Sequence, residues 1–169
     1  MNWARVVGAL GVVAMVTAPG CLCSKKAPDQ QLGPIVRPLC LEASPRLNWY
    51  DGRANTLYVR IYQLSTPDAF AQADAGRLLD RDAALPGAEG APLERTIFPG
   101  RKEMVELRQQ RDAAYLGVVA GYFKLQGRGK VHRKLPPPPS DDDDDDDDDD
   151  EKKPALDCIL FGPNGIEGE

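Results

Sequence analysis

The sequence has little of what catalysis and metal binding require. Its 169 residues include one histidine, His132, and four cysteines, none of which form a Cys-x-x-Cys pair. No nucleophile-elbow motif and no Gly-rich phosphate loop accompanies the histidine. We therefore predict no enzyme, no metal site and no cofactor, with His132 as a solvated strand residue in the basic stretch 128–134.

The chain also lacks an apolar run long enough to cross a bilayer, which takes about 20 residues. An apolar run without charge, residues 6–16, follows one positive charge and precedes the small residues before Cys21. This order predicts a secretory signal peptide over residues 1–20. Because Gly20 is followed by Cys21, the site resembles a bacterial lipobox, although Ala18 and Pro19 depart from its usual residues. We predict lipidation of Cys21; the alternative is an ordinary secreted protein that is cut near Ala18.

The region after Cys21 divides into a tether and a domain. Residues 21–33 contain Lys, Gln and Pro without periodicity, which predicts a lipidated N-terminus and flexible spacer. Residues 34–169 are predicted to form the folded domain. Leu22 follows Cys21, so nothing in the sequence favours retention in the inner membrane.

The net charge of −5 comes from one segment. Ten consecutive aspartates occupy 141–150, and without them the chain carries +5. With the four prolines before them, they predict a disordered Pro/Asp-rich loop over 136–153. A neutral expansion is favoured over weak multivalent calcium binding or an autoinhibitory fold-back onto the basic strand. Nucleic acid is not expected as a partner, because a lipoprotein of the cell envelope does not encounter nucleic acid.

The cysteines fit an oxidising compartment. Cys40 and Cys158 lie in apolar stretches near the two ends of the folded region, whereas Cys23 lies in the tether. We predict a Cys40–Cys158 disulfide; the alternative is two buried free thiols.

Short strands separated by turn residues dominate the folded region, and 15 prolines and 16 glycines argue against a helical bundle. The predicted strands are 35–44, 57–62, 93–98, 102–108, 113–123, 131–135 and 156–161. One helix is predicted over 67–80, with Thr66 as its N-cap and Pro67 at its first position. About seven strands and one helix predict an all-β fold, a β-sandwich of two antiparallel sheets.

Four blocks of sequence resemble the TssJ family of type VI secretion lipoproteins. The first is Tyr58-Val59-Arg60-Ile61-Tyr62-Gln63-Leu64, followed by Ala69-Phe70 and Leu78-Leu79. The others are Phe98-Pro99-Gly100, the strand Tyr115-Leu116-Gly117-Val118-Val119-Ala120-Gly121-Tyr122, and Ala43-Ser44-Pro45 with Asn48. The resemblance covers residues of about 39 to 123. The resemblance is weaker after residue 123, where Lys130-Val131-His132-Arg133 stands in place of the family's Trp-Arg pair.

The resemblance implies a transthyretin-like sandwich with a short helical insertion after the second strand. It also implies a structural lipoprotein at the periplasmic face of the outer membrane. Such a protein binds the periplasmic C-terminal region of a TssM-like inner-membrane protein, in a complex with a TssL-like protein. The alternative function is a lipid-anchored or secreted periplasmic binding module for a small ligand or calcium.

The implied partner-binding loop joins the first two strands, and its candidate contact residues are Arg46, Leu47, Asn48, Trp49 and Tyr50. Apolar and aromatic side chains at a loop tip favour an interface. The alternative is that Trp49 and Tyr50 fold back over the open end of the sandwich.

Overall fold

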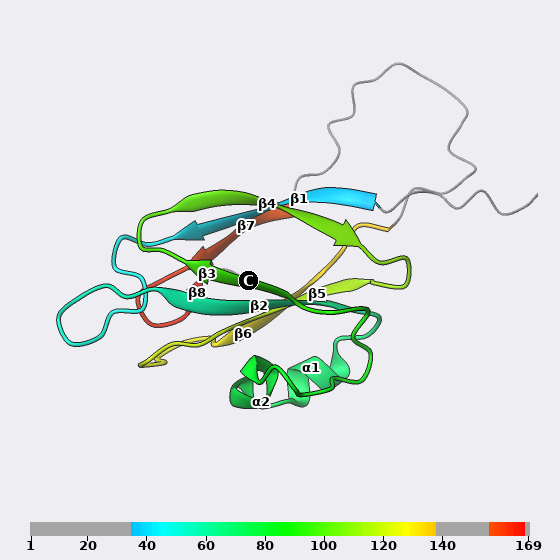
Figure 1. Cartoon of the computed structure of the whole chain (residues 1–169), viewed down its shortest axis with the longest axis horizontal. Helices are drawn as coiled ribbons and strands as arrows, with labels where there is room; N and C mark the ends of the chain where they lie inside the picture. The colour runs from blue at the N-terminus through cyan, green and yellow to red at the C-terminus, as the bar shows by residue number, and fades with distance from the viewer. Residues whose placement is uncertain (1–34, 138–155, 168–169) are drawn as a thin grey trace, which may run out of the picture. The chain divides into compact units, whose positions relative to one another are not determined.

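The computed structural model describes residues 35–137 and 156–167. Over these residues the chain forms eight strands in two four-stranded sheets and two short helices (Figure 1). This confirms the predicted all-β sandwich with a helical insertion after the second strand. The predictions for residues 1–33, including lipidated Cys21, and for most of the Pro/Asp-rich loop 136–153 lie outside the described residues.

One sheet has the order β4-β1-β7-β8. Its strands are β1 (Ile35–Ala43), β4 (Lys102–Gln109), β7 (Leu156–Phe161) and the two-residue β8 (Ile166–Glu167). Most pairs are antiparallel, as predicted, but β1 and β7 run parallel. Both of these strands therefore run toward the same end of the domain.

The other sheet has the order β3-β2-β5-β6 and is antiparallel throughout. Its strands are β2 (Leu57–Leu64), β3 (Leu93–Ile97), β5 (Tyr115–Ala120) and β6 (Lys130–Lys134). Strands β3 and β4 lie in different sheets, so Pro99-Gly100 forms a corner between the layers. Gly100 has a φ of 68°, and Arg101 N donates to Phe98 O at 3.2 Å, as in a type II turn.

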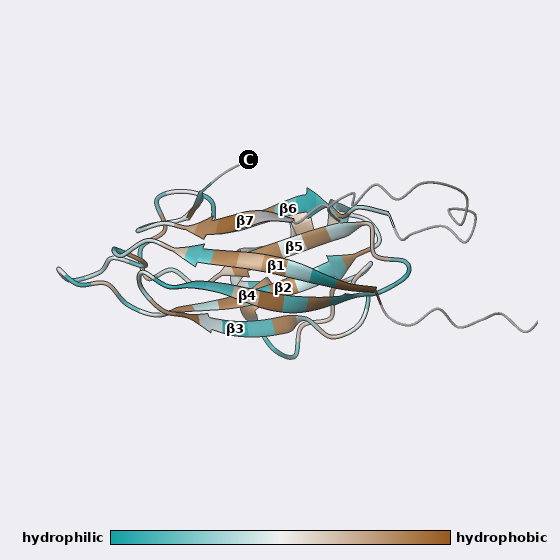
Figure 2. Cartoon of the chain, turned by 90° about the horizontal axis from the view of Figure 1, so that it is seen from above, coloured by the Kyte–Doolittle hydropathy of each residue, from teal (hydrophilic) through white to brown (hydrophobic). Residues whose placement is uncertain are grey.

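The main core lies between the two sheets and consists of aliphatic side chains with Phe161. Apolar and polar residues alternate along the strands that face the viewer in Figure 2, as expected where one face of a sheet is buried and the other is solvated. Strand β5 is buried on both faces, because the helical insertion covers its outer side. Gly117 permits this cover: a Cβ there would lie 2.9 Å from the Phe70 ring.

The predicted single helix is wrong in detail. The insertion contains two five-residue helices, α1 (Asp68–Gln72) and α2 (Ala75–Leu79). Extended backbone at Ala73 and Asp74 separates them, and the Asp74 carboxylate caps α2 by accepting from Gly76 N at 2.9 Å. Pro67, without a side-chain cap, takes the N-cap position of α1 that was predicted for Thr66. Neither helix is long and apolar enough to span a membrane, within the residues that the structure describes.

Polar side chains fasten the insertion to the sheet. Buried Arg60 donates to the carbonyls of Leu78, at 3.0 Å, and Asp80, and the Tyr62 hydroxyl donates to Leu78 O at 2.5 Å. From β6, Lys130 Nζ donates to the carbonyls of Phe70, Ala71 and Ala73. These cations satisfy carbonyls at the ends of α1 and α2, where helices leave acceptors unpaired.

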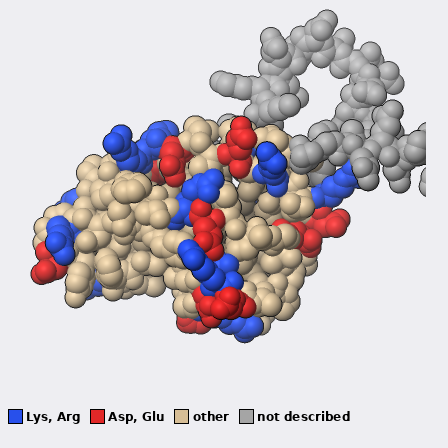
Figure 3. Space-filling view, viewed as in Figure 1, with Lys and Arg blue, Asp and Glu red and all other residues tan. Residues whose placement is uncertain are grey.

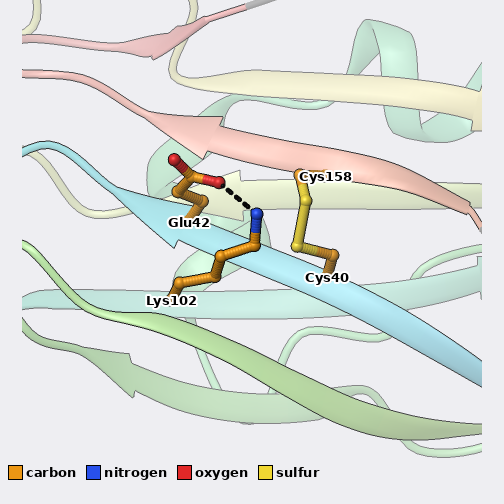
Figure 4. Close-up of a disulfide and its surroundings, with 4 residues drawn as sticks. All are labelled: Cys40, Glu42, Lys102 and Cys158. Atoms are coloured by element: carbon orange, nitrogen blue, oxygen red, sulfur yellow. Dashed lines mark ion pairs between the residues drawn. A yellow bond between two sulfur atoms is a disulfide. The ribbon is translucent and has the colours of Figure 1, made fainter.

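The predicted disulfide is present. Cys40 on β1 and Cys158 on β7 are joined across the parallel pair, with a separation of 118 residues in sequence (Figure 4). Beside it, Lys102 Nζ lies 2.8 Å from a Glu42 carboxylate oxygen. The bond therefore ties the first strand of the domain to the strand that follows the Pro/Asp-rich segment.

Candidate functional site

The loop between β1 and β2 begins with a tight turn that buries Leu47. Leu47 N donates to Ser44 O at 2.9 Å, and Ser44 Oγ accepts from Arg46 N at 3.1 Å. The Leu47 side chain is fully buried in the main core. The prediction of Leu47 as an exposed contact residue is therefore wrong, because the turn directs this side chain between the sheets.

Asn48 is also buried and holds the loop in place. Its backbone has a φ of 46°, a left-handed conformation that asparagine tolerates better than most residues. Its amide nitrogen donates to Thr56 O at 2.9 Å, and its amide oxygen accepts from Phe123 N at 2.9 Å. With 2% of its surface exposed, Asn48 cannot offer a contact surface, so its role in the loop is positional.

Trp49 is half-buried beside the turn that follows β7. Its backbone N–H donates to Pro163 O at 2.7 Å, and the Arg46 guanidinium lies 4.6 Å from the centre of its ring. Arg46 itself is exposed. The stacked pair thus places a cation and a partly exposed aromatic ring at the end of the sandwich.

The tip of the loop is a two-residue turn. Tyr50 and Arg53 exchange backbone hydrogen bonds at 3.0 and 3.2 Å, and the residues between them, Asp51 and Gly52, both have positive φ. This is the type I′ geometry that an Asp-Gly pair favours. It leaves Tyr50 51% exposed, so Tyr50 does not close the sandwich.

A second loop, between β5 and β6, lies against the first. The Phe123 ring is 66% exposed, and its centre lies 5.4 Å from that of Tyr50. Leu125, 49% exposed, follows it. Sequence reasoning missed these residues because it placed Phe123 at the end of a strand, whereas β5 ends at Ala120. The Gly121 and Gly127 that bracket the segment were the available signal for a loop.

Both loops and the β7–β8 turn form one end of the domain, at the left in Figure 1. Gln126 N donates to Asn164 O at 2.9 Å, and Ile166 N donates to Arg128 O at 2.8 Å. The pKa of Tyr122, at the base of the second loop, is raised well above its ordinary value by burial and by nearby Glu167. Its phenol is therefore neutral at physiological pH.

The described residues contain one cluster with metal-ligand side chains, Cys40, Glu42 and Cys158. The two sulfurs are bonded to each other and Glu42 pairs with Lys102, so the cluster is not a thiolate site. His132 is exposed on β6, as predicted. Basic and acidic side chains are interspersed over the face in Figure 3, which does not resemble the continuous basic surface of nucleic-acid binders.

Residues 37–151 match the family described as type VI secretion lipoprotein, VasD, EvfM, TssJ. The chain belongs to this family. The TssJ family consists of structural lipoproteins of the type VI secretion system and is not a family of enzymes. No match was found among curated proteins.

Solved structures support the TssJ fold. The T6SS lipoprotein TssJ1 from Pseudomonas aeruginosa is similar at 24% identity and a TM-score of 0.63, over 79% of this chain and 94% of that one. Serratia marcescens Lip, described as a membrane-bound component of the type VI secretion system, is similar at 21% identity and a TM-score of 0.62, over 79% of this chain and 96% of that one. A chain in the structure of the TssM C-terminal domain (869–1107) from EAEC is similar at 20% identity and a TM-score of 0.56, over 78% of this chain and 95% of that one.

Proposed function

We propose that this lipoprotein attaches a TssM-like inner-membrane protein to the outer membrane. In this proposal the lipid on Cys21 holds the protein at the periplasmic face of the outer membrane. The β1–β2 loop then binds the periplasmic C-terminal region of the TssM-like protein, which also associates with a TssL-like protein. Family membership supports the assignment to the secretion machine, and the likeness to a chain in a TssM structure supports the partner.

The observation that carries the proposal is the position of the loop relative to the start of β1. Strand β1 starts at Ile35, at the opposite end of the domain from the β1–β2 loop (Figure 1). Nine residues in a strand span about 30 Å. A protein held by residues before Ile35 can therefore present this loop away from its membrane anchor, toward a partner in the periplasm.

Within the predicted set Arg46–Tyr50, the contacts divide into two groups. Arg46, Trp49 and Tyr50 are exposed or half-buried and are proposed to touch the partner. Leu47 and Asn48 are buried and act by fixing the loop. A preformed loop loses little conformational entropy on binding, which favours its use as an interface.

Co-purification tests this function. The full-length lipoprotein is expressed with the periplasmic C-terminal region of the TssM-like protein from the same organism, and the complex is isolated through a tag on either partner. We expect a stoichiometric complex with wild type and a strongly reduced yield with Tyr50→Ser. Met104→Ser is the matched control, since Met104 is 59% exposed on the outer face of β4. Failure of the wild-type proteins to co-purify would contradict the proposal.

A further inference from the structure

The β5–β6 loop adds a second apolar surface to the end of the domain. Phe123 and Leu125 are its exposed apolar residues, and Phe123 lies against Tyr50 of the first loop. Contiguous exposed apolar patches often mark interaction sites, and aromatic residues such as tyrosine are enriched among interface hot spots. The three residues Tyr50, Phe123 and Leu125 are called the apolar tip below.

The two loops are fixed to each other, so they act as one surface. Asn48 bonds to the backbone of Phe123, while Gln126 and Arg128 bond to the β7–β8 turn. Leu125 folds back over Gly129, where a Cβ would lie 2.9 Å from a Leu125 methyl carbon. A contact made by either loop therefore constrains the position of the other.

The charged residues around the apolar tip are mostly basic. Arg46, Arg53 and Lys124 are exposed on the two loops, and Asp51 is the acid among them. An apolar centre with a basic rim fits a partner surface in which apolar side chains are surrounded by carboxylates. A basic rim also fits anionic lipid. However, β1 begins at the end of the domain opposite the apolar tip, so the tip is far from the point where the lipid-bearing segment joins the domain.

We infer that the β5–β6 loop, through Phe123 and Lys124, forms the second half of the docking surface and binds an acidic, apolar-centred patch on the TssM-like protein. This inference rests on the proposed function. It extends the contact from one loop to two and specifies the charge of the partner's surface. The basic rim accelerates association and makes it dependent on salt, while the apolar tip supplies the slow dissociation.

The test is a calorimetric titration of the full-length lipoprotein, kept soluble in detergent, with the periplasmic C-terminal region of the TssM-like protein at two salt concentrations. Phe123→Ser is expected to weaken binding about tenfold or more, as at an interface hot spot. Lys124→Glu is expected to weaken binding at low salt and to flatten the salt dependence. Met104→Ser and Arg108→Glu, both exposed on the outer face of β4, are matched controls that should bind as wild type does.

The outcomes separate this inference from the function on which it rests. If wild type does not bind, both fail. If wild type binds and the Phe123 and Lys124 variants bind equally well, with unchanged unfolding midpoints, the inference alone is overturned. In a third experiment, binding of the wild type and of the Phe123→Ser variant to vesicles that contain anionic phospholipid is measured. If Phe123→Ser abolishes vesicle binding and leaves partner binding intact, the apolar tip is a lipid contact and the inference is also overturned.

Discussion

Asn48 and Phe123 are joined by a hydrogen bond that spans 75 positions of the sequence. The amide oxygen of Asn48 accepts the backbone N–H of Phe123 at 2.9 Å, while its amide nitrogen donates to Thr56 O. One buried side chain thereby closes its own loop and secures the base of the next. Asn48 therefore links the two loops directly at this end of the sandwich.

Replacing Asn48 should destabilise the domain and loosen both loops. Asn48→Ala leaves the N–H of Phe123 and the carbonyl of Thr56 without partners, which costs about 1–3 kcal/mol. Urea unfolding measures the loss, and faster hydrogen exchange of the Phe123 amide locates it. Asn48→Gly is the matched comparison, because glycine accepts the positive φ and lacks the amide. Wild-type stability of Asn48→Gly would show that the hydrogen bonds contribute nothing.

Leu47 should behave as a core residue. Leu47→Ala is expected to lower the free energy of unfolding by about 2–5 kcal/mol, the range for truncation of a buried leucine. Thermal and urea denaturation check this value. A variant such as Leu47→Asp would lose partner binding through unfolding, so it cannot test the interface. A stability change below about 1 kcal/mol for Leu47→Ala would contradict its burial.

The disulfide should make a large contribution to stability. Replacing Cys40 and Cys158 together by alanine removes a cross-link over 118 residues, which the chain-entropy model values at about 4–5 kcal/mol. Urea unfolding of wild type with and without a reductant should show the same difference. An unchanged midpoint in both experiments would show that β1 and β7 are held by the sheet alone.

Arg60 should hold the helical insertion against the sheet. Arg60→Met removes the buried donor to the Leu78 and Asp80 carbonyls, and hydrogen bonds to charged groups contribute about 1.5–3 kcal/mol each. We expect protease sites within residues 68–80 to become accessible before the domain unfolds. Arg81→Met is the control: exposed Arg81 lies 3.2 Å from a Glu94 carboxylate oxygen, as Arg60 lies 3.6 Å from the other, and this change should leave cleavage as in wild type.

Alkaline pH should destabilise the domain through two tyrosines. Burial raises the pKa of Tyr62 and, together with Glu167, that of Tyr122. Because the folded-state pKa lies above the unfolded value of 10.0, the neutral forms favour folding below that pH, and this stability is lost as the pH rises through the folded pKa. Tyr122→Phe should reduce the loss measured by denaturation above about pH 10. An identical pH profile would contradict the burial effect.

Local patterns predicted the strands well and the loop end less well. The strands predicted over 57–62 and 102–108 correspond to β2 and β4, because turn residues and alternating side chains are local signals, whereas the placement of β3 and β4 in different sheets is not local. The parallel pairing of β1 with β7 depends on the path of the whole chain. The two residues of β8 are too few to show a period, and the break at Ala73–Asp74 had no Gly or Pro to mark it.

In the candidate site, too, local features could be predicted from the sequence, whereas features set by the whole fold could not. The loop with Trp49 and Tyr50 was identified from its composition and from the family resemblance, but the burial of Leu47 follows from a turn whose direction is set by the sheets. Phe123 ends an apolar run, so its sequence context favours a strand. Its exposure follows from the end of β5 at Ala120, which pairing with β2 and β6 determines.

Site-specific photo-crosslinking in intact cells tests the central claim most directly. A benzophenone amino acid replaces Arg53, which is exposed at the tip of the β1–β2 loop, and in a control replaces Met104 on the outer face of β4. We predict an adduct between the lipoprotein and the TssM-like protein from position 53 and none from position 104. An adduct with the TssM-like protein from position 104 alone, or from neither position, would contradict attachment through this end of the domain.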